Sequence, residues 1–162
     1  MSSPASIMGH PIHPMIIPFP IALWVFSFLA DLVYLWRGNT GWEWMASWTL
    51  LAGCVGAVAA AIFGIIDWLS IKDREVKKVA DWHARFNVLA LVLFAISWYL
   101  RRGVDFANPN GKLTLPIALS VVGIIAITIS GWLGGELVFK YGVAVNPQND
   151  SRPDEAAKAR VA

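Results

Sequence analysis

The chain has 162 residues, of which 57% are hydrophobic and only 15% are charged, and its mean hydropathy is +0.57. Water-soluble domains carry about 45–50% apolar and about 25% charged residues, so the composition excludes that class. The formal net charge of +2 is small, and the basic residues are scattered, which gives no support to nucleic-acid binding. The single cysteine, Cys54, excludes an internal disulfide and any multi-cysteine metal site.

Four stretches are apolar enough to cross a bilayer, which takes about 20 residues in a helix. They are Ile16–Trp36, Trp44–Ile71, Ala84–Leu100 and Leu113–Phe139. The connections are short, and we interpret the charged segment Lys72–Asp81 as a loop. Short connections favour antiparallel neighbours, so residues 1–145 are predicted to form an all-α, up-down four-helix transmembrane bundle. The polar segment 146–162 is predicted to be a disordered cytoplasmic tail.

The distribution of Lys and Arg predicts the orientation in the membrane. Nine of these residues fall on the side that carries both termini, and four fall on the other side. Because cytoplasmic flanks are enriched in Lys and Arg, we expect a multi-pass protein of the bacterial inner membrane with both termini in the cytoplasm.

Four polar residues lie at the cytoplasmic ends of the predicted spans, one for each span: His13, Asp67, His83 and Glu136. An ionisable group within a span costs a few kcal/mol, so each requires a partner or a function. In an antiparallel bundle the four positions fall in one layer. The prolines between Gly9 and Pro20 predict a bent approach that folds a histidine over the bundle.

Two kinds of cofactor suit this layer. In the first interpretation His13 and His83 are the axial ligands of a haem b, with His10 as a substitute for His13. In the second, His13, His83, Asp67 and Glu136 bind a transition metal such as zinc, iron or copper.

A third interpretation needs no cofactor. The histidines then hydrogen-bond lipid headgroups, Asp67 caps its helix or pairs with Lys72, and Glu136 pairs with Lys140. At the outer end, Asp31 requires a basic partner, for which Arg101, Arg102 and Arg37 are candidates. Glu43 is expected to interact with the positive end of the second helix dipole.

Several segments resemble a family of small bacterial membrane proteins of unknown function. They are the opening Gly9-His10-Pro11-Ile12-His13-Pro14-Met15, the pair Asp67-Trp68, His83 with Asn87, Ser97-Trp98-Tyr99-Leu100-Arg101-Arg102, and the closing run from Gly131-Trp132-Leu133-Gly134-Gly135-Glu136-Leu137-Val138 to Val143. The resemblance implies that some relatives are fused to Rieske-type iron–sulfur domains, and hence a redox role in the membrane. It therefore favours a cytochrome-like protein that passes electrons to a quinone or another membrane redox partner, with Asp67 and Glu136 as proton-linked groups. No enzymatic signature and no oligomeric state can be read from the chain.

Overall fold

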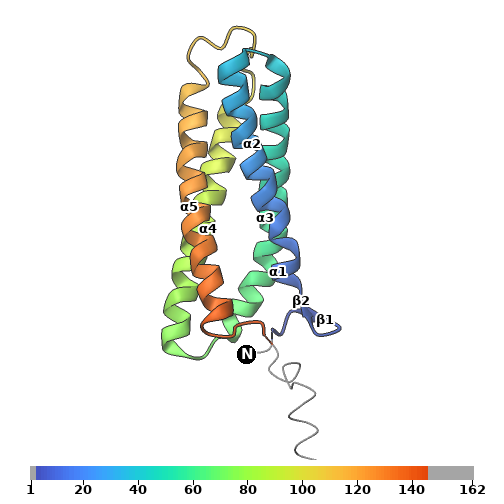
Figure 1. The fold of residues 1–162 in the computed structure, drawn as a ribbon, viewed down its shortest axis with the longest axis vertical. Helices are drawn as coiled ribbons and strands as arrows, with labels where there is room; N and C mark the ends of the chain where they lie inside the picture. Colours follow the sequence, from blue (N-terminus) through green and yellow to red (C-terminus); the bar gives the residue numbers. More distant parts are fainter. Residues whose placement is uncertain (1–2, 146–162) are drawn as a thin grey trace, which may run out of the picture.

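The computed structural model describes residues 3–145, and the predicted tail at 146–162 lies outside them. A short hairpin, β1 (Ser6–Ile7) and β2 (His10–Pro11), precedes five helices. The helices are α1 (Ile12–Ile16), α2 (Pro18–Arg37), α3 (Thr40–Ser70), α4 (Arg74–Arg101) and α5 (Thr114–Phe139). The predicted all-α bundle is confirmed, because α1 with α2, and each of the other three helices, is long and apolar enough to cross a membrane (Figure 1).

The bundle consists of two helical hairpins that lie side by side. Helix α2 packs along α3, and α4 packs along α5, while smaller contacts join α3 to α4 and α2 to α5. Helices α2 and α4 are therefore diagonally opposite each other. The β-hairpin, α1 and the end of α5 lie at the same end of the bundle, and the long loop between α4 and α5 lies at the other end (Figure 1).

The approach to the first span is interrupted between α1 and α2, at Ile17. Pro14 and Pro18 lack the backbone N–H groups that a continuous helix would use here. Ile12 begins α1 by donating its N–H to the carbonyl of Ala5 at 2.9 Å, which holds the β-hairpin against the start of the helix. The short helix α1 packs on α3 and thereby brings His13 to the bundle.

The prediction of a loop at 72–81 was wrong, because α4 begins at Arg74. The side chain of Asp73 caps this helix by accepting the N–H groups of Glu75 at 2.9 Å and Val76 at 3.0 Å. The Glu75 carboxylate also pairs with Lys78 one turn later, at 2.7 Å. As a result His83 lies in the third turn of α4, and not at its opening as the sequence analysis expected.

The second hairpin repeats contacts of the first at a shift of 70 residues, which is the separation of Asp31 and Arg101. In the first hairpin the Ser27 hydroxyl donates to the carbonyl of Ala46 at 2.8 Å. In the second, the hydroxyl of Ser97 donates to the carbonyl of Pro116, also at 2.8 Å and also across 19 residues. The sequence analysis did not detect this repeat.

Equivalent residues of the two hairpins face each other across the bundle axis. Trp24 and Phe94, 70 positions apart, stack with ring centroids at 4.5 Å. Each ring lies directly on a glycine of its own hairpin, Trp24 on Gly53 and Phe94 on Gly123, where an added Cβ would come within 2.5 Å and 2.7 Å of the rings. The two hairpins are therefore related by a pseudo-two-fold axis that runs parallel to the helices through the buried core.

Candidate cofactor site

The two histidines predicted as ligands meet at the end of the bundle that carries the β-hairpin. His13 comes from α1 and His83 from α4, and their ring centroids are 6.5 Å apart with planes at 88°. They are equivalent residues of the two hairpins, since their positions differ by the same 70 residues. The structure thus brings His13, at the start of the first span, close to His83, near the start of the third.

The ring of His13 is held by the backbone of α3. Its Nδ1 lies 2.8 Å from the carbonyl oxygen of Ala60, to which it donates a hydrogen bond. The ring lies against Gly64, where an added Cβ would be only 2.9 Å from two ring atoms. A glycine at this position therefore allows the imidazole to approach the helix backbone.

The ring of His83 is held in the same way by α5. Its Nδ1 lies 2.9 Å from the carbonyl oxygen of Ser130, and the Ser130 hydroxyl lies 3.1 Å from the same nitrogen. The ring lies against Gly134, where an added Cβ would be 3.0 Å away. Both histidines reach a carbonyl 47 residues further along the chain, so the whole anchoring arrangement is duplicated.

These contacts decide which nitrogen of each ring is available to a ligand. Because a carbonyl can only accept, Nδ1 carries the proton in each neutral ring, and the lone pair is on Nε2. On His83, the Asn87 side-chain amide donates to Nε2 and also to the His83 carbonyl, at 3.0 Å in both cases. An Nδ1–H bonded to a backbone carbonyl is the arrangement that typically orients a metal-binding histidine.

The two predicted carboxylates have other partners. Asp67 accepts a hydrogen bond from the Ser3 hydroxyl at 2.5 Å. Glu136 pairs with Lys140 at 2.5 Å, one of the contacts expected without a cofactor, and this hydrogen bond raises the pKa of Lys140. Within residues 3–145 no three His, Cys, Asp or Glu side chains are grouped so that they could hold a metal ion.

His10, the substitute ligand in the sequence analysis, lies on strand β2 and is exposed. Its Nδ1 is 3.1 Å from the carbonyl oxygen of Met8, in the tight turn of the β-hairpin. The structure therefore brings His13, and not His10, to His83.

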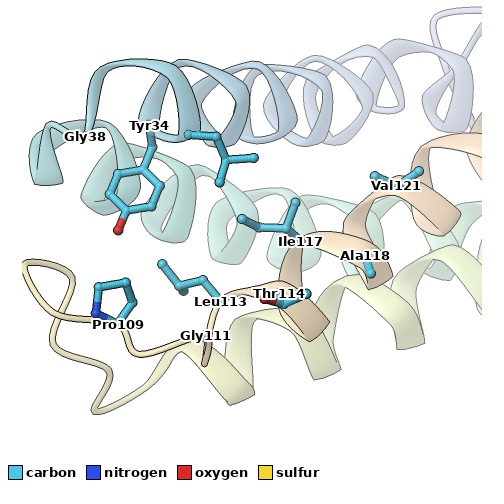
Figure 2. Close-up of a pocket in the computed structure, with 10 residues that line it drawn as sticks. Tyr34, Gly38, Pro109, Gly111, Leu113, Thr114, Ile117, Ala118 and Val121 are labelled. Atoms are coloured by element: carbon cyan, nitrogen blue, oxygen red, sulfur yellow. The ribbon is translucent and has the colours of Figure 1, made fainter.

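A pocket of about 560 Å³ lies at the opposite end of the bundle, between the end of α2, the loop and the start of α5 (Figure 2). Its walls are largely apolar and include Leu35, Leu113, Ile117 and Val121, with Tyr34 beside them. The pocket is separate from the histidine pair and offers no nitrogen or carboxylate ligand.

At that same end Asp31 pairs with Arg101, one of its three predicted partners. Glu43 lies in the first turn of α3, as expected, but it is also completely buried and pairs with Arg101 at 2.6 Å, which the sequence analysis did not predict. The sequence contains one signal for this pairing. Glu43, like Asp31, is a carboxylate near the outer end of an apolar span, and a carboxylate in that position requires a partner.

The chain matches the model of one protein family, described as a predicted membrane protein (DUF2231), over residues 9–147. The match covers most of the chain, so the protein belongs to this family. It contains all four candidate spans and both histidines of the pair. No curated protein and no solved structure showed a significant match to the chain.

Proposed function

We propose that this member of the DUF2231 family is a haem-binding redox protein of the bacterial inner membrane, with His13 and His83 as the axial ligands. The observation that carries the proposal is the pair of imidazoles on opposite sides of the bundle, each fixed through Nδ1 by a backbone carbonyl. Iron bound in a haem by two imidazoles exchanges one electron between its ferric and ferrous states. The protein residues then have to hold and orient that group.

The separation of the rings suits a shared metal ion. A ring nitrogen lies about 2.0–2.1 Å from a transition metal, so two imidazoles bound through facing nitrogens have centroids about 6.3 Å apart. The observed separation is 6.5 Å. The ring planes are at 88° to each other, so the two imidazoles do not stack face to face.

The surroundings of the pair also suit a flat macrocycle. Ala60, whose carbonyl accepts from His13, is buried, and Ala90 and Ala126 are buried in one cluster with Trp24 and Phe94. Small side chains of this kind let a planar group approach the helix backbones. His13 belongs to the first hairpin and His83 to the second, so such a group would be held between the two hairpins.

Asn87 has a distinct part in this proposal. Its amide donates to Nε2 of His83, the lone pair that would bind iron, and to the His83 carbonyl one turn away. Ligand binding would end only the first of these contacts, and the second would still hold the amide. Asn87 therefore stabilises the neutral, correctly oriented imidazole before the cofactor enters.

The alternative of a carboxylate-containing metal site has less support, since Asp67 and Glu136 are engaged by Ser3 and Lys140.

The proposed orientation places the histidine end in the cytoplasm, because Lys72, Arg74, Lys77 and Lys78 flank that end. A quinone or another membrane redox partner would then exchange electrons with the site. The family resemblance, which implies that some relatives carry Rieske-type domains, favours the same redox role.

The test is an absorption spectrum of the detergent-purified protein, oxidised and then reduced with dithionite, with metal analysis of the same sample. We expect a Soret band and a sharp α band in the reduced protein, and one haem for each chain. Both bands should be lost in His13→Ala and in His83→Ala. The matched control is His10→Ala, which removes the third histidine and should leave the spectrum unchanged.

Other outcomes would decide against haem. A colourless protein with one metal ion for each chain would favour a non-haem imidazole site. A protein with neither cofactor, after expression with ample haem and metals, would make the bundle a structural membrane protein. Retention of full haem by the His83 variant would also refute the ligand assignment.

A further inference from the structure

A second polar cluster lies deep in the bundle at the end opposite the histidines. The Arg101 guanidinium binds Asp31 with both of its terminal nitrogens, at 2.6 Å and 2.8 Å. The same guanidinium donates to one oxygen of Glu43, Oε1, at 2.6 Å. Asp31 and Glu43 are completely buried, and Arg101 is 2% exposed.

The charges of this cluster do not balance if all three groups are ionised. Two carboxylates and one guanidinium leave one excess negative charge within an apolar bundle, and an unpaired buried charge is strongly unfavourable. Asp31 has both oxygens on the guanidinium, which makes it the carboxylate that Arg101 neutralises. Glu43 has only one paired oxygen, so the excess charge would belong to Glu43.

The second oxygen of Glu43 gives independent evidence. Oε2 is buried and has no hydrogen-bond partner among the described residues. An ionised carboxylate distributes its charge over both oxygens, and leaving one of them bare in an apolar setting costs more than leaving a neutral hydroxyl bare. The buried, unpartnered oxygen is therefore the position where a proton relieves both the charge and the desolvation.

We propose that Glu43 is a proton-binding site, with its carboxyl group protonated on Oε2 in the folded protein. The protonated Glu43 accepts from Arg101 through its carbonyl-like Oε1, and the Asp31–Arg101 pair remains ionised and neutral. The ligand of this site is a proton, and the site is separate from the histidine pair, so the proposal does not depend on haem.

The groups that face Glu43 come from three helices. Helix α2 provides Asp31 and the Tyr34 hydroxyl, which donates to the carbonyl of Phe106 at 3.0 Å. Helix α4 provides Arg101, and on α5 the Ser120 hydroxyl lies 3.4 Å from that guanidinium. Arg101 is the one positive charge among these groups.

The position of Glu43 also gives the proton a short route to water. Helix α3 begins at Thr40, three residues before Glu43, which is about 4.5 Å along the helix axis. Beyond the cluster, the apolar side chains of Phe106 and Leu113 pack on Tyr34 and cover it.

The experiment is infrared spectroscopy of the purified full-length protein at neutral pH, in H₂O and in D₂O. A protonated carboxyl group has a C=O stretch well separated from carboxylate bands, and this band shifts on deuteration. We expect one such band in the wild-type protein and its loss in Glu43→Gln. Glu75→Gln, which changes an exposed glutamate paired with Lys78, is the matched control and should retain the band.

Isotope labelling of the wild-type protein keeps the test valid if the Glu43 variant does not fold. The band should shift when glutamate carries a ¹³C carboxyl group, and should not shift when aspartate carries it. A shift with labelled aspartate would place the proton on Asp31 and overturn the proposal. The absence of any protonated carboxyl band at neutral pH would overturn it as well.

Discussion

Two glycines determine how closely the histidine rings approach the helices. Gly64 lies under His13 and Gly134 under His83, and at each an added Cβ would press on ring atoms at 3.0 Å or less. A side chain at either position would push the imidazole off the carbonyl that holds its Nδ1. The glycines therefore contribute to the separation of the two rings, which is the basis of the proposed function.

We predict that Gly64→Ala displaces the ring of His13 and weakens cofactor binding. Overpacking of this kind costs about 1–3 kcal/mol, so haem affinity should fall by roughly fivefold to 150-fold, and haem should be lost during detergent purification. The measurement is haem content for each chain, together with the thermal unfolding midpoint. Gly131→Ala is the control, because an added Cβ there meets nothing within 4 Å.

At this scale the sequence predicted part of the site. His13 and His83 were selected because ionisable groups near a span are costly, and that argument depends on residue type alone. The roles of Gly64 and Gly134 were not predicted, since a glycine on a transmembrane helix has the same pattern whether it contacts a neighbouring helix or an imidazole. The pairing of Glu43 with Arg101 required the mutual position of α3 and α4.

At the scale of the helices, α4 differs most from expectation. Its first turns carry Glu75, Lys77 and Lys78, and hydropathy alone assigns such a segment to a loop. The helix extends to Arg74 because Asp73 satisfies two of its free N–H groups, and because Val76 and Ala80 on one face are buried against Ile71 and Leu137. A run of charged residues therefore does not mark the end of this helix.

Removal of this cap should have a measurable effect. We predict that Asp73→Ala lowers the free energy of unfolding by about 0.5–2 kcal/mol, the usual effect of losing an N-cap side chain. Faster hydrogen exchange should be confined to the first turns of α4. Lys72→Ala, at the adjacent exposed position outside the helix, should change neither quantity. An equal loss in both variants would contradict the assigned role of Asp73.

For the whole molecule, the four spans were predictable because hydropathy depends only on local composition. The repeat was not, since the two halves share few identical residues, among them His13 and His83, Ser27 and Ser97, and Gly64 and Gly134. Other equivalent positions differ in type, as Trp24 and Phe94 do. The symmetry lies in the contacts that equivalent residues make, so it can be recognised only when the contact partner of each residue is known.

The orientation of the whole bundle is open to a direct test. In a Cys54→Ala background, Asn108→Cys should react with a membrane-impermeant maleimide in intact cells, because the loop between α4 and α5 is predicted to face outward. Lys72→Cys should react only after the membrane is permeabilised. The reverse pattern would place the histidine end outside the cytoplasm and contradict the prediction from Lys and Arg.

The pairing of Asp31 with Arg101 has a consequence for assembly in a crowded membrane. These residues occupy equivalent positions of the two hairpins, so each hairpin presents one sign of charge to its counterpart. Two first hairpins from different molecules would bring aspartate against aspartate, and two second hairpins would bring arginine against arginine. Like charges buried together oppose association, whereas the unlike pair is neutral. The pair therefore favours packing of a first hairpin on a second hairpin over packing of two like hairpins.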